Sequence, residues 1–192
     1  MKIKNSTESS VCRLCAGELD LRFSARVLDK YDIQYFKCKN CQALQTQTPF
    51  WLNEAYEENN LSNLDTGAAQ RNLQNLAASF LMSRLFRLKN VIDFGGGDGL
   101  LCRLMRDYSI NCFVRDKFAS PTYAQGFDQP DFAEPDLLVA FEVLEHFGCP
   151  NSDLDLIFRF DPKVLLFSTA IYSNESLNWW YLSTKSGQHV FF

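Results

Sequence analysis

The sequence has little histidine, no long apolar run and no excess of positive charge. Its only histidines are His146 and His189. A helix needs about 20 mainly apolar residues to cross a bilayer, and no stretch approaches this. The start, MKIKNSTESS, also lacks the apolar centre of a secretory signal. We therefore expect a cytoplasmic protein with no membrane span.

Charge is distributed unevenly along the 192 residues, whose formal net charge is −4. The first 50 residues carry eight lysines and arginines against five acidic residues, whereas the remainder carries eleven against eighteen. An acidic main part disfavours a nucleic acid partner, because phosphates bind to basic surfaces. A small-molecule partner is expected instead.

Four of the seven cysteines form two C-x-x-C pairs, Cys12 with Cys15 and Cys38 with Cys41. Each pair can direct two thiolates at one tetrahedral ion, and four thiolates leave no open position, so the pattern predicts a structural zinc site. The alternative is that the four are unrelated buried or disulfide-bonded cysteines. The stretches LRFSARVL and KYDIQYFKC between the pairs have hairpin character. Residues 1–50 are thus expected to form a small zinc-ribbon-like module.

Residues 51–90 are expected to form a linker and then an amphipathic helix capped by Asp65. Apolar residues recur there at steps of three and four, which predicts that this face packs on the following domain: Leu73, Leu76, Ala77, Phe80, Leu81, Leu85 and Leu88. The remaining cysteines are expected in the core: Cys102, Cys112 and Cys149.

The stretch VIDFGGGDGL, residues 91–100, is a short apolar run followed by four glycines in five positions. A P-loop would end in Gly-Lys-Ser/Thr, which is absent. The third glycine of a dinucleotide fingerprint would fall on Leu100 or on Cys102. The pattern D-x-G-x-G-x-G does fit, with the residues Asp93, Gly95, Gly97 and Gly99.

This pattern resembles motif I of the class I S-adenosylmethionine-dependent methyltransferases. Asp116, 17 positions after Gly99, matches the family's acidic residue that binds the ribose hydroxyls. Residues 136–146, DLLVAFEVLEH, are similar to its fourth-strand motif, and KVLLFST, residues 163–169, to its fifth strand. The resemblance implies a Rossmann-like, mostly parallel α/β sheet over residues 91–192, with flanking helices. It implies S-adenosylmethionine bound by Asp93, Gly95, Gly97, Gly99, Asp116, Asp128 and Glu142.

The segments CRLCAG and CKNCQALQT make the chain similar to bacterial zinc-ribbon methyltransferases of small molecules and sugars. That resemblance implies methyl transfer to a small acceptor, most simply a hydroxyl of a sugar or a similar metabolite. The family's sheet usually has seven strands, whereas this sequence ends about twenty residues after the fifth. The last helix and the closing hairpin are therefore expected to be missing, which leaves an exposed sheet edge. Either the chain is truncated, or a second copy or another partner covers that edge. The alternative is an inactive relative that acts as a zinc-containing binding or scaffold protein.

Glu142, Glu145 and His146 have the spacing that places side chains on one face of a helical turn. Joined by His189, they resemble the divalent-metal site of ubiquinone-pathway and small-RNA O-methyltransferases, which implies Mg²⁺ or another divalent cation. Three interpretations remain open: this metal site, catalysis by His146 or His189 as a general base beside Glu142, or a structural role for both histidines.

Overall fold

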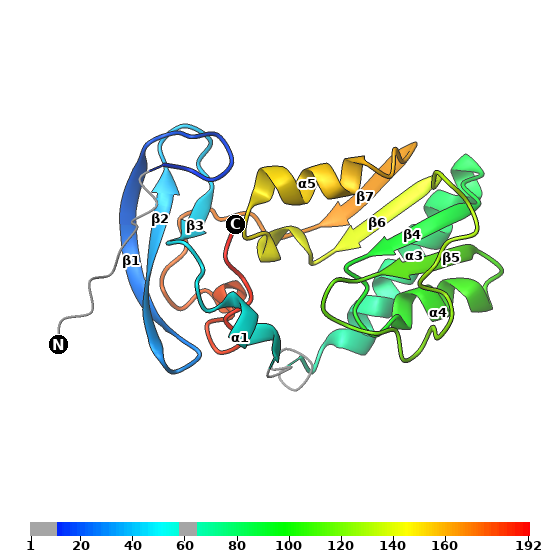
Figure 1. Ribbon diagram of the computed structural model, residues 1–192, viewed down its shortest axis with the longest axis horizontal. Helices are drawn as coiled ribbons and strands as arrows, with labels where there is room; N and C mark the ends of the chain where they lie inside the picture. The colour runs from blue at the N-terminus through cyan, green and yellow to red at the C-terminus, as the bar shows by residue number, and fades with distance from the viewer. Residues whose placement is uncertain (1–10, 58–64) are drawn as a thin grey trace. The chain divides into compact units, whose positions relative to one another are not determined.

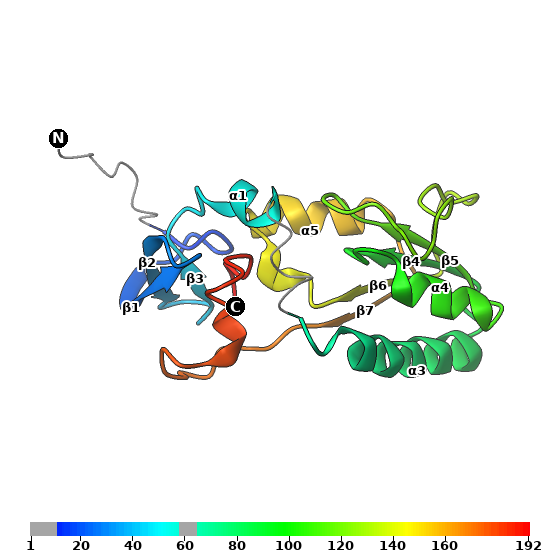
Figure 2. The same cartoon turned by 90° about the horizontal axis from the view of Figure 1, so that it is seen from below.

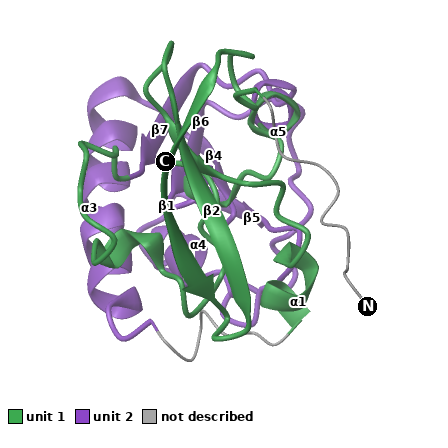
Figure 3. Ribbon diagram, turned by 90° about the vertical axis from the view of Figure 1, so that its left-hand side faces the viewer, with its two compact units in different colours: residues 1–64, 145–153, 170–192 green, residues 65–144, 154–169 purple. Residues whose placement is uncertain are grey.

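The computed structural model describes residues 11–57 and 65–192 (Figure 1). The chain divides into two compact units, coloured separately in Figure 3. Unit 1 comprises Met1–Leu64, Glu145–Asp153 and Ala170–Phe192, and unit 2 comprises Asp65–Leu144 and Leu154–Thr169. This division differs from the expected ranges 1–50, 51–90 and 91–192, because the chain returns to unit 1 twice after leaving it.

The sheet of unit 1 begins with the expected hairpin. Strand β1 (Leu19–Val27) pairs antiparallel with β2 (Tyr31–Cys38), and β2 pairs antiparallel with β3 (Leu44–Thr46). Cys38, the last residue of β2, lies opposite Leu19, the first residue of β1. The open end of the hairpin therefore leads into the Cys38–Cys41 pair.

The C-terminal residues complete this unit. Phe192 and Leu44 exchange two backbone hydrogen bonds, of 2.8 and 2.9 Å, and the Thr46 amide donates to the Val190 carbonyl at 3.1 Å. Helix α1 (Leu52–Glu57) and the 3-10 helix η2 (Trp180–Leu182) lie beside them. Their shared core is aromatic-rich and buried, and includes Tyr35, Trp51, Tyr172, Tyr181, Val190 and Phe192.

Unit 2 contains a parallel sheet with the strand order β5-β4-β6-β7 in the described part of the chain. The strands are β4 (Asn90–Phe94), β5 (Asn111–Arg115), β6 (Leu137–Phe141) and β7 (Val164–Ser168). Helices α3 (Ala68–Phe86) and α4 (Leu100–Asp107) cover one face, and α5 (Pro150–Phe158), which enters this unit at Leu154, covers the other (Figure 2). The predicted Rossmann-like α/β fold is confirmed.

The strand count implied by the resemblance is wrong. Treating residues 137–141 as a fourth strand requires another strand after β5, but the described residues 116–136 contain none. This segment carries Pro121, Pro130 and Pro135, and proline cannot donate a hydrogen bond to a sheet. A single backbone bond, from Val114 to the Phe127 carbonyl at 2.8 Å, ties the segment to β5.

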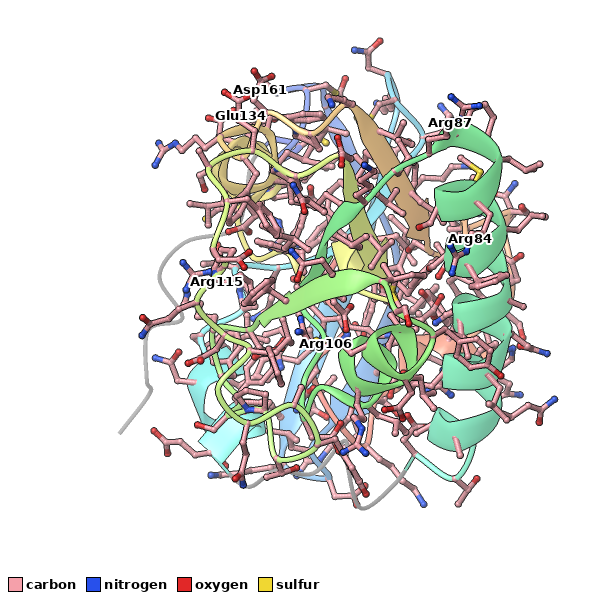
Figure 4. The ribbon with its side chains drawn as sticks, turned by 90° about the vertical axis from the view of Figure 1, so that its right-hand side faces the viewer. Arg84, Arg87, Arg106, Arg115, Glu134 and Asp161 are labelled. Atoms are coloured by element: carbon pink, nitrogen blue, oxygen red, sulfur yellow. The ribbon has the colours of Figure 1, made fainter. Side chains whose placement is uncertain are left out.

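Arg106 holds the same segment against the sheet. Its guanidinium lies 3.5 Å from the centroid of the Phe127 ring and donates to the Cys112 carbonyl at 2.8 Å. Figure 4 shows Arg106 on α4 where that helix meets β5. A cation stacked on an aromatic face and hydrogen-bonded to backbone has a structural role here.

The predicted apolar face of α3 is wrong for four of its members. Leu73, Leu81 and Leu85 are 56 to 66% exposed and Ala77 is also exposed, whereas the buried residues of the helix are Leu76, Ser79 and Ser83. The small serine side chains on the buried face allow close packing. With this face inward, the three leucines face outward. The helix begins at Ala68, and its N-cap position is Gly67 with no side-chain capping hydrogen bond, so the predicted cap by Asp65 is wrong. Asp65 accepts instead from the Gly67 amide, one residue before the helix. In the described ranges, neither α3 nor any other helix has the length and apolar character to cross a membrane.

The three remaining cysteines divide between core and surface. Cys102 and Cys112 are fully buried, as expected. Cys149 is exposed, because it lies in the short connection before α5, where its amide donates to Asp153. Its predicted place in the core is wrong.

Candidate functional site

The glycine turn follows β4 and leads into α4. Gly95, Gly97 and Gly99 have φ of 71°, 56° and 83°, a region that favours glycine. A Cβ on Gly95 would lie 2.6 Å from a methyl group of Val143, whereas one on Gly97 would meet nothing within 4 Å. The space beside Gly97 is therefore open, and the backbone there can be approached by a ligand.

Asp93 lies beneath this turn and is 3% exposed. Its Oδ2 is buried and has no hydrogen-bond partner in the described structure, and a Cβ on Gly96 would collide with it. Burial, reinforced by the charges of Asp116 and Asp98, raises the pKa of Asp93 to about 7. A buried carboxylate oxygen without a partner is suited to a ligand that brings a positive charge or donors, and S-adenosylmethionine has both an ammonium and a sulfonium group.

Asp116 lies at the carboxyl end of β5, next to the turn. Its Oδ2 accepts from the Gly97 amide at 2.9 Å, and its Oδ1 accepts from the amides of Phe118 and Ala119 at 2.7 and 2.8 Å. The structure thus brings together two residues that the sequence placed in one site. The ribose role of Asp116 stays a prediction. So does cofactor binding by Asp128, which is exposed in the following segment.

Glu142 lies just beyond β6, at the same edge of the sheet. Its Oε1 accepts from the Ser168 hydroxyl at 2.7 Å. Its φ is 55°, and the 3-10 helix η1 (Leu144–His146) begins two residues later. The helical turn expected to carry Glu142 together with Glu145 and His146 is therefore not formed, because the chain is left-handed at Glu142.

The four cysteines of the C-x-x-C pairs converge in unit 1. Sγ of Cys12 lies 3.7 Å from that of Cys41, and Sγ of Cys15 lies 3.5 Å from that of Cys38. Four thiolates about 2.3 Å from one tetrahedral zinc ion would be about 3.8 Å apart, so these spacings fit the ion. A Cβ on Gly17 would come within 2.9 Å of Cys38 Sγ, which leaves this position to glycine.

The thiol chemistry also suits a metal. A hydrogen bond from the Gly17 amide lowers the pKa of Cys15 to about 6, whereas burial raises the pKa of Cys12. The Asn40 amide and side chain donate to Cys38 and Cys15. Zinc would bind the deprotonated thiolates and would displace the remaining protons.

A second group of potential metal ligands lies in unit 1. One ligand atom from each of Glu145, His146 and His189 lies within 4.8 Å of the others. The two imidazole rings are 4.8 Å apart in an edge-on arrangement. Three of the four predicted ligands are thus brought together, and Glu142 is not part of this group. We refer to Glu145, His146 and His189 as the histidine cluster.

A hydrogen bond determines the tautomer of His189, whereas burial lowers the pKa of His146. Nδ1 of His189 lies 2.7 Å from the Tyr181 carbonyl, which only accepts, so Nδ1 carries a proton and the neutral ring has its lone pair on Nε2. Nδ1 of His146 lies 3.0 Å from the Tyr56 hydroxyl. Burial and the neighbouring His189 lower the pKa of His146 to about 3, against the effect of the Gln188 backbone.

Several hydrogen-bond partners in these sites could not be identified from sequence patterns. The Tyr181 hydroxyl donates to the buried Glu145 carboxylate at 2.6 Å, and the Tyr56 and Ser168 hydroxyls contact His146 and Glu142. Each lies far in sequence from the residue it contacts.

The chain matches a family model described as a methyltransferase domain over residues 56–192. No curated protein matches the sequence. The matched region includes the glycine turn, Asp116, Glu142 and the histidine cluster, and it covers well over half of the chain. The chain therefore belongs to the methyltransferase domain family, and its parallel sheet and glycine turn are those of the class I type that uses S-adenosylmethionine.

Proposed function

We propose that the protein transfers the methyl group of S-adenosylmethionine to a hydroxyl of a small acceptor, a sugar or a similar metabolite. The observation that carries the proposal is the open backbone at Gly97, next to Gly96, which lies against the buried, partnerless Oδ2 of Asp93. The bound cofactor would supply a methyl group activated on its sulfonium. Asp93, Gly97, Asp116 and Glu142 would hold and orient it.

Within the proposal, His189 takes the proton from the acceptor hydroxyl. The Tyr181 carbonyl fixes its Nδ1–H tautomer, which presents the lone pair of Nε2. The Glu145 carboxylate of the same cluster favours the imidazolium that forms. The acceptor class rests on the resemblance to sugar-modifying enzymes.

A metal-assisted form of the same reaction is the second candidate. The histidine cluster offers two imidazoles and one carboxylate that is 0% exposed. This donor set suits zinc or iron better than Mg²⁺, which prefers oxygen ligands. Bound there, a cation would lower the pKa of an acceptor hydroxyl. Turnover that ignores chelators too weak to remove the cysteine-bound zinc would exclude this form.

Calorimetric titration with S-adenosylmethionine tests the cofactor site. The wild type should bind it, and Gly97→Arg should not, because the long side chain would occupy the open space. Gly126→Arg is the matched control: Gly126 has φ of 80° and also has nothing within 4 Å of an added Cβ. Equal binding by both variants would refute the assignment of the turn, and a folded wild type that does not bind would favour the scaffold function.

Transfer of a radiolabelled methyl group to a panel of free sugars, nucleotide sugars and polyols tests the reaction. His189→Gln should keep cofactor binding and lose transfer. If His189→Gln transfers at the wild-type rate, the assignment of the base is wrong.

A further inference from the structure

Arg13 occupies the first position inside the Cys12–Cys15 knuckle, but its side chain points to another part of unit 1. One terminal nitrogen, Nη1, donates to the Gly148 carbonyl at 2.9 Å. The other, Nη2, donates to the Val190 carbonyl at 2.6 Å and to that of Thr46 at 3.3 Å. The side chain therefore joins three segments that are far apart in the sequence.

Two of these segments carry the histidine cluster. Gly148 follows His146 by two residues, and Val190 follows His189 by one. The segments also bond directly, since the Val190 amide donates to the Glu145 carbonyl at 2.8 Å. Arg13 thus holds the backbone next to both histidines with a single planar group.

The knuckle itself is fixed to the same segments. The Arg13 amide donates to the Gln45 side chain at 2.9 Å, and Asn151 donates to the carbonyls of Arg13 and Leu14 at 3.3 and 3.1 Å. The guanidinium lies 5.9 Å from the centroid of the Phe191 ring, and its Nε is buried. A buried guanidinium with this many fixed acceptors has one geometry, which a lysine ammonium cannot reproduce.

We propose that Arg13 is a positioning residue for the histidine cluster. Through Arg13, the Cys12–Cys15 knuckle determines how His146 and His189 are placed relative to each other. A metal ion in the cysteine site would hold the knuckle, and the knuckle would hold Arg13. Its hydrogen bonds to the Gly148 and Val190 carbonyls would then keep the imidazoles in the arrangement that selects the Nδ1–H tautomer of His189. This deepens the proposed function, because it concerns the groups that would act on the acceptor.

The test measures the ¹⁵N NMR chemical shifts of the imidazole nitrogens in the zinc-loaded protein. In the wild type His189 should show one protonated and one unprotonated nitrogen. In Arg13→Met these two signals should move toward a common averaged position, as the tautomers exchange. Arg26→Met is the matched control, because Arg26 lies in the same unit and forms an exposed ion pair with Asp32 at 3.0 Å. It should keep the wild-type ring signals.

Two further measurements separate local from general effects. Cobalt substituted for zinc should give the same thiolate charge-transfer absorption in wild type and Arg13→Met, which shows that the cysteine site persists. Arg13→Lys, which keeps the charge, should shift the ring signals in the same direction. Wild-type ring signals in Arg13→Met or in Arg13→Lys would overturn the proposal, and so would unfolding of both variants, because a positioning residue leaves the fold in place.

Cofactor binding keeps this test distinct from that of the proposed function. Arg13→Met should bind S-adenosylmethionine as the wild type does, since the glycine turn belongs to unit 2. Failure of the wild type to bind the cofactor would count against the proposed function alone, and the ring signals would still decide the role of Arg13.

Discussion

The Asp116 carboxylate accepts a hydrogen bond from the Gly97 amide at 2.9 Å, which joins the end of β5 to the glycine turn after β4. This contact connects the two most distinctive features of the sequence pattern. It holds the loop at the position where the backbone is open to a ligand.

Asp116→Asn should weaken S-adenosylmethionine binding by about 10- to 100-fold, because charged hydrogen bonds are worth about 1.5–3 kcal/mol. Calorimetry measures the change. Asp107→Asn serves as the control, since Asp107 is exposed and pairs with Arg103 on α4. An Asp116→Asn protein with wild-type affinity would remove Asp116 from the cofactor site.

Asp93→Asn should change stability in a pH-dependent way. The native pKa of about 7 lies above the ordinary value of 3.8, so the native state keeps a proton that the unfolded state releases. Stability therefore falls as the pH rises from about 4 to about 7, by up to about 1.4 kcal/mol per pH unit. Asp93→Asn should flatten this slope, and urea unfolding at pH 5 and pH 8 measures it. An unchanged slope would contradict the buried state of Asp93.

Elemental analysis should find about one zinc ion per chain, held by the four cysteines. Replacing Cys38 and Cys41 by serine should remove the ion and lower the melting temperature, because metal binding contributes directly to the folding of small modules. Cys149→Ser is the control, since Cys149 is exposed and outside the cysteine group. Full zinc content in the double variant would rule out this site.

Tyr181→Phe should destabilise the protein by about 1–3 kcal/mol, because it removes a donor from the buried Glu145 carboxylate. Denaturant unfolding measures the loss. Tyr123→Phe, at an exposed position, should be neutral. Equal stabilities of the two variants would mean that Glu145 does not depend on the Tyr181 hydroxyl.

The sequence was informative where structure depends on neighbouring residues. The turn from Gly95 to Gly99 and the strands β4, β6 and β7 could be predicted, because their patterns lie within a few positions of one another. The cysteine pairs could be identified equally well, since the two thiols of each pair lie within four residues of one another.

Contacts between distant segments could not be predicted. Nothing near Leu44 indicates that Phe192 pairs with it, and nothing near His146 indicates Tyr56. The orientation of α3 could not be predicted for a related reason. The helix buries Ser79 and Ser83, and the spacing of apolar residues does not indicate that small polar residues face the core. In the segment after β5, three prolines disfavour the strand that the family pattern would place there.

The pairing of Phe192 with Leu44 has a consequence for the order of folding. Strand β3 emerges from the ribosome early, yet the backbone groups of its outer edge are satisfied only when residues 190–192 have been made. The parallel sheet of unit 2 can form before that moment, whereas the cysteine-bearing unit waits for contacts of very long sequence separation, which form slowly. The cysteine-bearing unit is thus completed after the parallel sheet, and nascent chains should acquire full protection of β3 from hydrogen exchange only after residues 190–192 have left the ribosome.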